Sequence, residues 1–161
     1  MARIKIVSGG QTGADTAALN FALRRGLPHG GWCPRGRKRE DGVIPPRYRL
    51  RETASRSYLP RTQANVRDSD GTAILSLGVR LKGGSRKTAE FARKQGKPCL
   101  HLAAGEPGID PASALRRFIR QHHIRVLNIA GPRKSEEPGI GRFVAGVLRE
   151  ALDQRARKAA R

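Results

Sequence analysis

The chain has 161 residues, of which 33 are basic and 13 acidic, giving a formal net charge of +20. A chain of this length suits one domain with its own core, so we expect residues 1–161 to form a single domain. Its two cysteines, Cys33 and Cys99, lack metal-ligand spacing, which argues against a disulfide framework or a zinc site. No apolar run is long enough for a secretion signal or a membrane span, so we expect a cytoplasmic protein without membrane contact.

The strong positive charge has three explanations at this stage. Arginine enrichment can follow from genome composition alone, the field can steer a small polyanion, or the chain can bind nucleic acid. Aromatic residues make up only 4% of the chain, and the basic residues are not interleaved with them. A stacking surface for single strands is therefore poorly supported, and we do not expect nucleic acid as a partner.

The first predicted strand, Ile4–Ser8, runs into a glycine-rich turn before a helix over Asp15–Arg25. Glycines allow positive φ and close backbone approach, and a helix start presents unpaired N–H groups to anions. The alternative is an ordinary tight turn. The residues that form this candidate anion site are Gly9, Gly10, Gln11, Thr12, Gly13 and Asp15.

A second short strand is predicted around Gly30–Cys33, followed by a long irregular segment, 34–57, which we call the flap. Trp32, Ile44, Tyr48 and Leu50 would anchor it, so we expect it to be ordered. Glu40 and Asp41 are expected to pair with flap arginines. An isolated cysteine such as Cys33 is typical of a small buried hydrophobe.

Beyond the flap, helix and strand patterns alternate. Helices are predicted over Pro60–Asp68, Ser85–Gln95, Pro111–His122 and Ile140–Arg157, with 156–161 as a frayed tail, and strands over Thr72–Leu77, Cys99–Ala103 and Arg125–Ala130. Near the first of these helices, Tyr58, Arg61, Thr62 and Asn65 form a polar row that could contact a ligand or a neighbouring subunit. The alternation predicts an α/β fold: a doubly wound, mostly parallel sheet of about five core strands with helices on both faces.

Two further glycine-rich loops follow the third and fifth strands. In such a sheet they would join the first loop at the carboxyl edge, where these folds bind ligands. Each loop could instead serve only as a cap or a turn. The candidate ligand contacts are Gly83, Gly84, Ser85 and Thr88 in one loop and Gly131, Arg133 and Ser135 in the other. A bulky residue at Gly10 or Gly84 should abolish ligand binding without unfolding the chain.

Five segments together resemble a known family: GGQTGAD at 9–15, GGWCPRGRKREDGVIPPRY at 30–48, RTQANVRDSDGTAIL at 61–75, GGSRKTAEFA at 83–92 and NIAGPRKSEEPGI at 128–140. The chain resembles the molybdenum cofactor carrier proteins over nearly its whole length. The resemblance implies a Rossmann-like domain related to the Lonely Guy and lysine-decarboxylase-like proteins. It also implies a homo-oligomer, a dimer or tetramer, that binds and protects molybdenum cofactor (molybdopterin).

The implied role carries further expectations about ligand and partners. Molybdate is an alternative small anionic ligand, molybdoenzymes could receive the cofactor, and Trp32 could stack on the pterin or pack in the core. The phosphoribohydrolase relatives resemble P-G-G-x-G-T-x-x-E, but the position three beyond Thr88 is Phe91, and the glutamate falls one residue early, at Glu90. We therefore expect a binding protein without catalytic or metal-ligating residues, with a nucleotide-binding protein or nucleoside-monophosphate hydrolase as the alternative.

Overall fold

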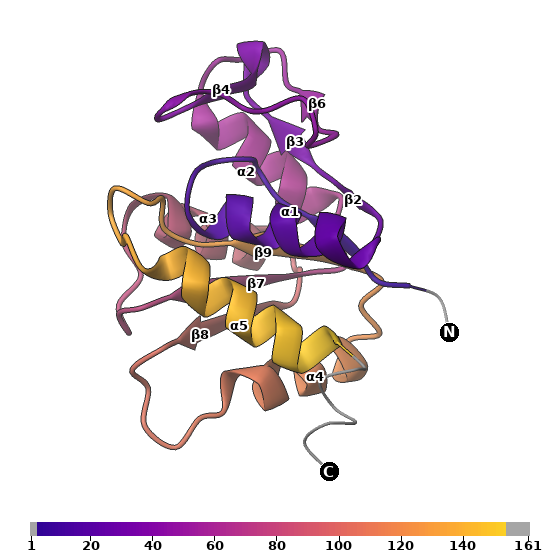
Figure 1. The fold of residues 1–161 in the computed structure, drawn as a ribbon, viewed down its shortest axis with the longest axis vertical. Helices are drawn as coiled ribbons and strands as arrows, with labels where there is room; N and C mark the ends of the chain where they lie inside the picture. Colours follow the sequence, from indigo (N-terminus) through magenta and orange to yellow (C-terminus); the bar gives the residue numbers. More distant parts are fainter. Residues whose placement is uncertain (1–2, 154–161) are drawn as a thin grey trace.

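The computed structural model describes residues 3–153 and contains a five-stranded parallel sheet (Figure 1). The strands lie side by side in the order β2 (His29–Gly30), β1 (Lys5–Val7), β9 (Val126–Ala130), β7 (Gly71–Ser76) and β8 (Cys99–Ala103). Every neighbouring pair is parallel, and β9, the last strand in the chain, lies between β1 and β7. The predicted α/β fold is confirmed.

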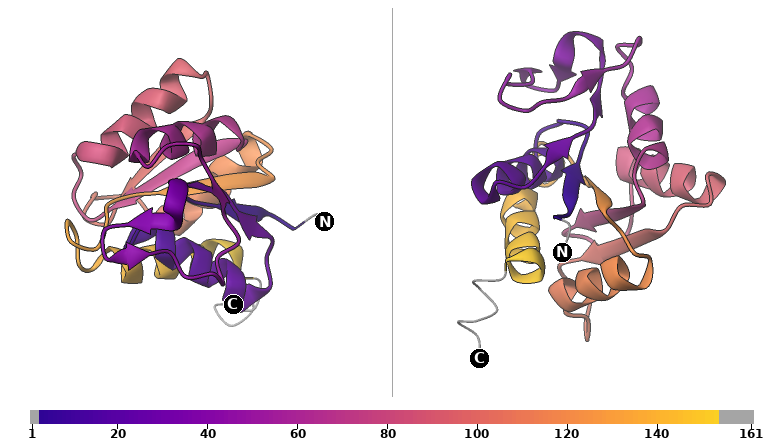
Figure 2. Two further views of the ribbon diagram at one scale, coloured as in Figure 1. Left: turned by 90° about the horizontal axis from the view of Figure 1, so that it is seen from above. Right: turned by 90° about the vertical axis from the view of Figure 1, so that its right-hand side faces the viewer.

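Helices cover both faces of this sheet. Figure 2 shows α1 (Ala14–Arg25) and α5 (Ile140–Leu152) on one side and α2 (Tyr58–Arg67) and α3 (Gly83–Lys94) on the other. The remaining helix, α4 (Pro111–Gln121), packs against α5 and β8. The result is a three-layer arrangement in which each loop after a strand crosses the same edge.

Most helix ends follow the sequence signals. Gly26 ends α1 in the left-handed conformation at φ 62°, and the Asp110 carboxylate accepts a hydrogen bond from Ser113 N at the start of α4. Some predicted boundaries were wrong. The Ser57 hydroxyl caps α2, so this helix begins two residues before Pro60, and α5 ends at Leu152 because Asp153 is extended. The predicted tail at 156–161 lies outside the described residues.

The two faces of the sheet differ in polarity. Leu127 and Ile129 of β9 are fully buried among side chains of α1, α4 and α5, which form the main apolar core. Because side chains alternate along a strand, Asn128 faces the other way, toward α2 and α3, where its amide donates to the Thr72 hydroxyl at 3.2 Å. The apolar face therefore supplies the core, and polar groups lie under α2 and α3.

The flap is ordered and contains short regular pieces. These are a 3-10 turn (η1, Arg35–Arg37), a hairpin of β4 (Lys38–Arg39) and β5 (Gly42–Val43), and β6 (Arg51–Glu52), which pairs in parallel with β3 (Trp32–Cys33). Ile44 and Tyr48 are fully buried against Leu19 and Cys33, with Leu50 packed beside them. The predicted anchors Ile44, Tyr48 and Leu50 and the buried cysteine are confirmed.

The predicted strand over Gly30–Cys33 divides at Gly31. A Cβ there would lie 2.3 Å from Ser8 O, and φ is +126°, so only glycine fits. The break ends β2 in the main sheet, and Trp32 and Cys33 pair with β6 instead. The flap begins directly after Cys33.

Candidate functional site: a cleft at the carboxyl edge of the sheet

The loops after β1 and β9 meet at the carboxyl edge of the sheet. Ala14 N donates to Pro132 O at 3.2 Å, and a Cβ at Gly13 would lie 2.6 Å from that same oxygen. A Cβ at Gly131 would lie 2.3 Å from Leu75 O. Gly13 and Gly131 therefore serve the close packing of strand ends and the start of α1.

The first glycine loop surrounds a carboxylate of its own chain. Gln11 N donates to Asp15 Oδ2 at 3.1 Å, and Asp15 is only 4% exposed. Burial raises the pKa of Asp15, while the nearby Arg61 guanidinium and the amides of Gln11 and Gly9 oppose that rise. The amides of Gln11 and Gly9 are thus directed at Asp15. This corrects the prediction that the backbone amides of the first glycine loop are free to bind a ligand anion.

Gly10 lies beneath the flap. A Cβ at this position would come within 2.7 Å of both Ile44 Cδ1 and Leu50 Cδ1, and φ is +78°. A bulky residue at Gly10 would displace two flap anchors, so we now expect it to destabilise the flap as well as to affect binding.

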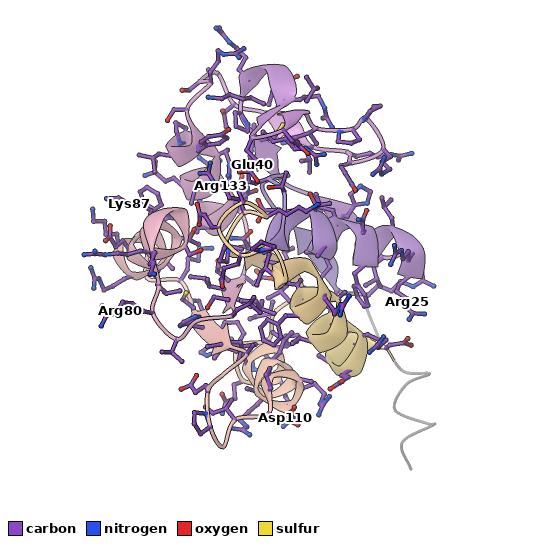
Figure 3. All side chains as sticks on the ribbon, turned by 60° about the vertical axis from the view of Figure 1, so that its left-hand side comes forward. Arg25, Glu40, Arg80, Lys87, Asp110 and Arg133 are labelled. Carbon is purple, nitrogen blue, oxygen red and sulfur yellow. The ribbon has the colours of Figure 1, made fainter. Side chains whose placement is uncertain are left out.

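The second glycine motif forms the first turn of α3. The helix begins at Gly83, two residues before the predicted Ser85, and the side chain of its N-cap residue, Lys82, makes no capping hydrogen bond. In the part of the chain that the structure describes, a Cβ at Gly83 or Gly84 would meet nothing within 4 Å, and the first turn of α3 contains no acidic residue. Arg80 and Lys87 project nearby (Figure 3). This helix start therefore presents uncapped amides and a positive dipole end in a basic setting.

The start of α3 borders a small cavity of about 70 Å³, which we call the small cavity. Loops and helices from four parts of the chain line it: Gln11, Asp15, Tyr58, Leu59, Arg61, Thr62, Gly84, Ser85, Thr88, Ala130, Gly131, Arg133 and Glu136. Seven of the fourteen predicted ligand contacts are among them. Gly9 lines an adjoining pocket with Asp15 and Thr88.

Two basic side chains of the small cavity share one aromatic ring. The guanidinium carbons of Arg61 and Arg133 each lie 5.5 Å from the centroid of Tyr58. Arg61 Nη1 also lies 3.7 Å from Asp15 Oδ2, and Arg133 Nε lies 3.0 Å from Glu136 Oε1. The polar row predicted near α2 thus faces the site through Tyr58, Arg61 and Thr62.

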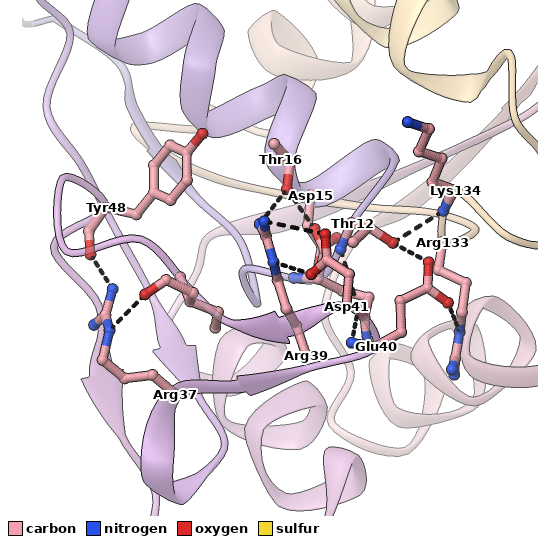
Figure 4. A network of polar contacts seen from close by, with 12 residues as sticks. Thr12, Asp15, Thr16, Arg37, Arg39, Glu40, Asp41, Tyr48, Arg133 and Lys134 are labelled. Carbon is pink, nitrogen blue, oxygen red and sulfur yellow. Dashed lines mark hydrogen bonds and ion pairs between the residues drawn. The ribbon is translucent and has the colours of Figure 1, made fainter.

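Thr12 and Ser135 contact the flap through Glu40. Figure 4 shows Glu40 between Thr12 and Arg133. The Thr12 hydroxyl donates to Glu40 Oε1, and the Ser135 hydroxyl donates to Glu40 Oε2 at 2.5 Å. Burial raises the pKa of Glu40, but the hydrogen bonds from Ser135 and Thr12 outweigh it, so the net pKa is lowered. Arg133 is the nearest basic partner, at 3.9 Å, so hydrogen bonds rather than flap arginines hold Glu40.

A second, larger cavity of about 640 Å³ lies on the other side of the α3 start and shares Ser85 and Glu136 with the small cavity. Its lining includes Gly83 and the residues Ser76, Gly78, Val79, Arg80, Leu81, Lys82, Ser85, Pro132, Glu136 and Glu137. Val79 is 64% exposed there. Sequence patterns assign no role to Val79 or Leu81, because isolated apolar residues in a loop carry no periodic signal.

Comparison with known proteins identifies the family. The model of the circularly permutated YpsA SLOG family matches residues 6–152. The chain belongs to this family. A solved structure from Syntrophus aciditrophicus, named "putative molybdenum carrier protein", is 48% identical, with a TM-score of 0.90 over 94% of this chain and 96% of that one. The predicted resemblance is confirmed.

A second solved structure resembles this SLOG family member only weakly. An (E)-4-hydroxy-3-methyl-but-2-enyl diphosphate reductase is 10% identical, with a TM-score of 0.38 over 92% of this chain and 59% of that one, which is too low to support an argument. No curated protein matches. Within residues 3–153, no helix is long and apolar enough to cross a membrane.

Trp32 lies away from the cleft of this SLOG protein. Its indole N–H donates to Asp68 Oδ2 at 2.8 Å, and Asp68 caps the C-terminal end of α2. Tyr58 and Arg61, which line the small cavity, lie in the first half of the same helix, about 15 Å and about 10 Å from Asp68 along its axis. The structure does not bring Trp32 to the predicted ligand contacts.

Proposed function

We propose that this SLOG family protein binds, stores and protects molybdenum cofactor or a related phosphorylated anion, with molybdate as the smallest such ligand, and carries out no reaction on it. The observation that supports this proposal is the uncapped start of α3, which borders both cavities at the carboxyl edge. The Syntrophus protein of 48% identity, named as a molybdenum carrier, supports the choice of cargo.

The two cavities suit the two ends of such a cargo. Helix starts favour anions, so a phosphate would lie against the amides of Gly84 and Ser85, with Arg80 and Lys82 balancing charge. The larger cavity, about 640 Å³, lies in the size range of small-molecule sites. Its apolar residues Val79, Leu81 and Pro132 would contact the flat face of a heterocycle. The cargo brings its own dithiolene sulfurs to the metal, so no protein thiol is required.

A hydrolase reaction finds little support in the arrangement of α3. Glu90, the carboxylate nearest to the hydrolase motif position, pairs with Arg86 and Lys87 at 3.4 Å each on the outside of the helix. Those pairs turn it toward solvent. We therefore propose a carrier that hands its cargo to molybdoenzymes in the cytoplasm, as a homo-oligomer.

A reconstitution assay tests the proposal. Purified protein loaded with molybdenum cofactor is incubated in air and then mixed with a cofactor-free molybdoenzyme, whose recovered activity is measured over time. Wild type should prolong the life of the cofactor, whereas Gly84→Leu should not, because the leucine would cover the α3 start. Gly146→Leu is the matched control, since a Cβ at Gly146 in α5 also meets nothing within 4 Å. Equal protection by wild type and Gly84→Leu, or none by wild type, would contradict the proposal.

A further inference from the structure

Two hydrogen-bond donors of residues that line the small cavity have no acceptor among residues 3–153. Gln11 is only 6% exposed, and its Oε1 accepts from Thr12 N at 3.1 Å and from Glu40 N at 2.9 Å. These two bonds fix the orientation of the amide, so Nε2 is the group left over, and it is buried without a partner. Arg61 Nε is likewise buried without a partner.

Buried donors without acceptors are costly, and their presence in a native cavity calls for an explanation. Both belong to residues that line the small cavity, where the first turn of α3 adds its uncapped amides. The residues around the cavity therefore carry two unpaired N–H groups, both closed off from solvent, and the start of α3 adds its amides at the cavity edge. The natural complement of such a wall is a group that only accepts hydrogen bonds.

We propose that the small cavity is a subsite for a tetrahedral oxyanion, either the terminal phosphate of the cargo or free molybdate, to which Gln11 Nε2 and Arg61 Nε donate hydrogen bonds. The inference rests on the proposed function and specifies which residues recognise the anionic end. Its size agrees, because about 70 Å³ is roughly twice the volume that one water molecule takes in the liquid. That space admits a group of a few heavy atoms.

The charges around the cavity also favour an anion. Arg61 and Arg133 are held in place by the Tyr58 ring, 5.5 Å from each guanidinium carbon. Asp15 is the opposing charge, but its carboxylate already accepts from Gln11 N, and burial raises its pKa, which favours the neutral form. Glu136 is occupied by Arg133 at 3.0 Å. An incoming dianion would thus meet the Arg61 guanidinium, the Arg133 guanidinium that Glu136 already pairs, and a helix start, beside an Asp15 carboxyl whose charge burial disfavours.

Titration calorimetry with sodium molybdate and with orthophosphate tests this subsite directly. Gln11→Glu keeps the oxygen that holds Thr12 N and Glu40 N but replaces the donor with an acceptor, so both anions should bind about 10–100-fold more weakly. Arg61→Lys keeps the charge beside Asp15 but loses Nε, and a loss of about tenfold is expected. Arg93→Gln, an exposed charge at the far end of α3, should bind both anions as wild type does.

Crystals of the wild-type protein soaked in molybdate provide a second measurement that does not depend on variant folding. The anomalous signal of molybdenum should place the anion where its oxygens reach Gln11 Nε2 and Arg61 Nε. Competition of ribose 5-phosphate with molybdate identifies the source, because a phosphate ester that displaces molybdate indicates the terminal phosphate of a larger cargo. Molybdate that resists displacement indicates the free anion.

The outcomes separate this inference from the proposed function. Weakened anion binding in both variants, with no cofactor protection by wild type, supports the subsite and refutes the carrier role. Cofactor protection by wild type, with unchanged anion affinity in Gln11→Glu and Arg61→Lys, overturns the subsite and leaves the carrier role standing. A molybdenum peak found only outside the small cavity also overturns it.

Discussion

Gly10 and Gly84 give a matched pair of substitutions with opposite expected effects on stability. At Gly10, an alanine would adopt φ +78° and place its Cβ 2.7 Å from both Ile44 Cδ1 and Leu50 Cδ1. The left-handed conformation costs about 1–2 kcal/mol, and shifting two packed methyl groups costs about 1 kcal/mol more. We expect Gly10→Ala to destabilise the protein by about 2–3 kcal/mol.

At Gly84 the same change should be neutral or stabilising. The added Cβ meets nothing within 4 Å, and alanine is favoured over glycine in a helix by about 0.5–1 kcal/mol. The two variants should therefore differ by about 3 kcal/mol, which is about 6–12 °C in Tm for a chain of this size.

Urea unfolding measures this difference, and hydrogen exchange over residues 38–50 shows where it arises. Gly10→Ala should increase exchange in the flap, while Gly84→Ala should leave it unchanged. If Gly10→Ala matched Gly84→Ala in stability and in flap exchange, the packing of the flap on the first glycine loop would be refuted.

Three further predictions concern the flap, Trp32 and the core. Glu40→Gln should speed amide exchange over residues 38–43 about tenfold, because it removes the charged acceptor of the Thr12 and Ser135 hydroxyls, worth about 1.5 kcal/mol. Unchanged exchange would show that these hydrogen bonds do not hold the flap. The hydrogen bond from Arg67 lowers the pKa of Asp68 from its ordinary value of 3.8 to about 2. Asp68 therefore stays ionised above pH 3.8, and its hydrogen bond from the Trp32 indole should be lost only as the pH falls toward 2. The fluorescence of this single tryptophan should thus be constant from pH 7 to 4, and a step above pH 4 that Asp68→Asn removes would contradict the geometry. Leu115→Ala should cost about 2–5 kcal/mol in urea unfolding, because Leu115 is fully buried in the main core, and a loss below 1 kcal/mol would argue against that packing.

Local sequence signals predicted much of the fold. Apolar segments separated by helical patterns were enough to predict a parallel sheet with helices on both faces, and Gly26 and Asp110 marked helix ends correctly. The position of β9 between β1 and β7 was not predictable in this way, because strand order depends on packing between segments that are far apart in the chain. The same holds for Gly31, whose role depends on the approach of Ser8 O.

The site shows the same division between local and long-range information. Glycines and small polar residues correctly indicated loops that meet at one edge of the sheet. The sequence could not show that Gln11 N and Gly9 N are directed at Asp15, or that Glu40 receives the hydroxyl of Ser135, 95 residues away. A glycine-rich turn offers its amides to any nearby carboxylate, and only the folded chain shows whether that carboxylate is its own.

Analysis of what the protein carries tests the central claim most directly. Wild type, Gly84→Leu and Gly146→Leu are purified from cells supplied with molybdate, and released small molecules are identified by mass spectrometry alongside elemental analysis for molybdenum. Wild type and Gly146→Leu should release a phosphorylated pterin with molybdenum, and folded Gly84→Leu should release neither. Equal loading of Gly84→Leu, or wild type that carries no such compound, would contradict a cargo site at the start of α3.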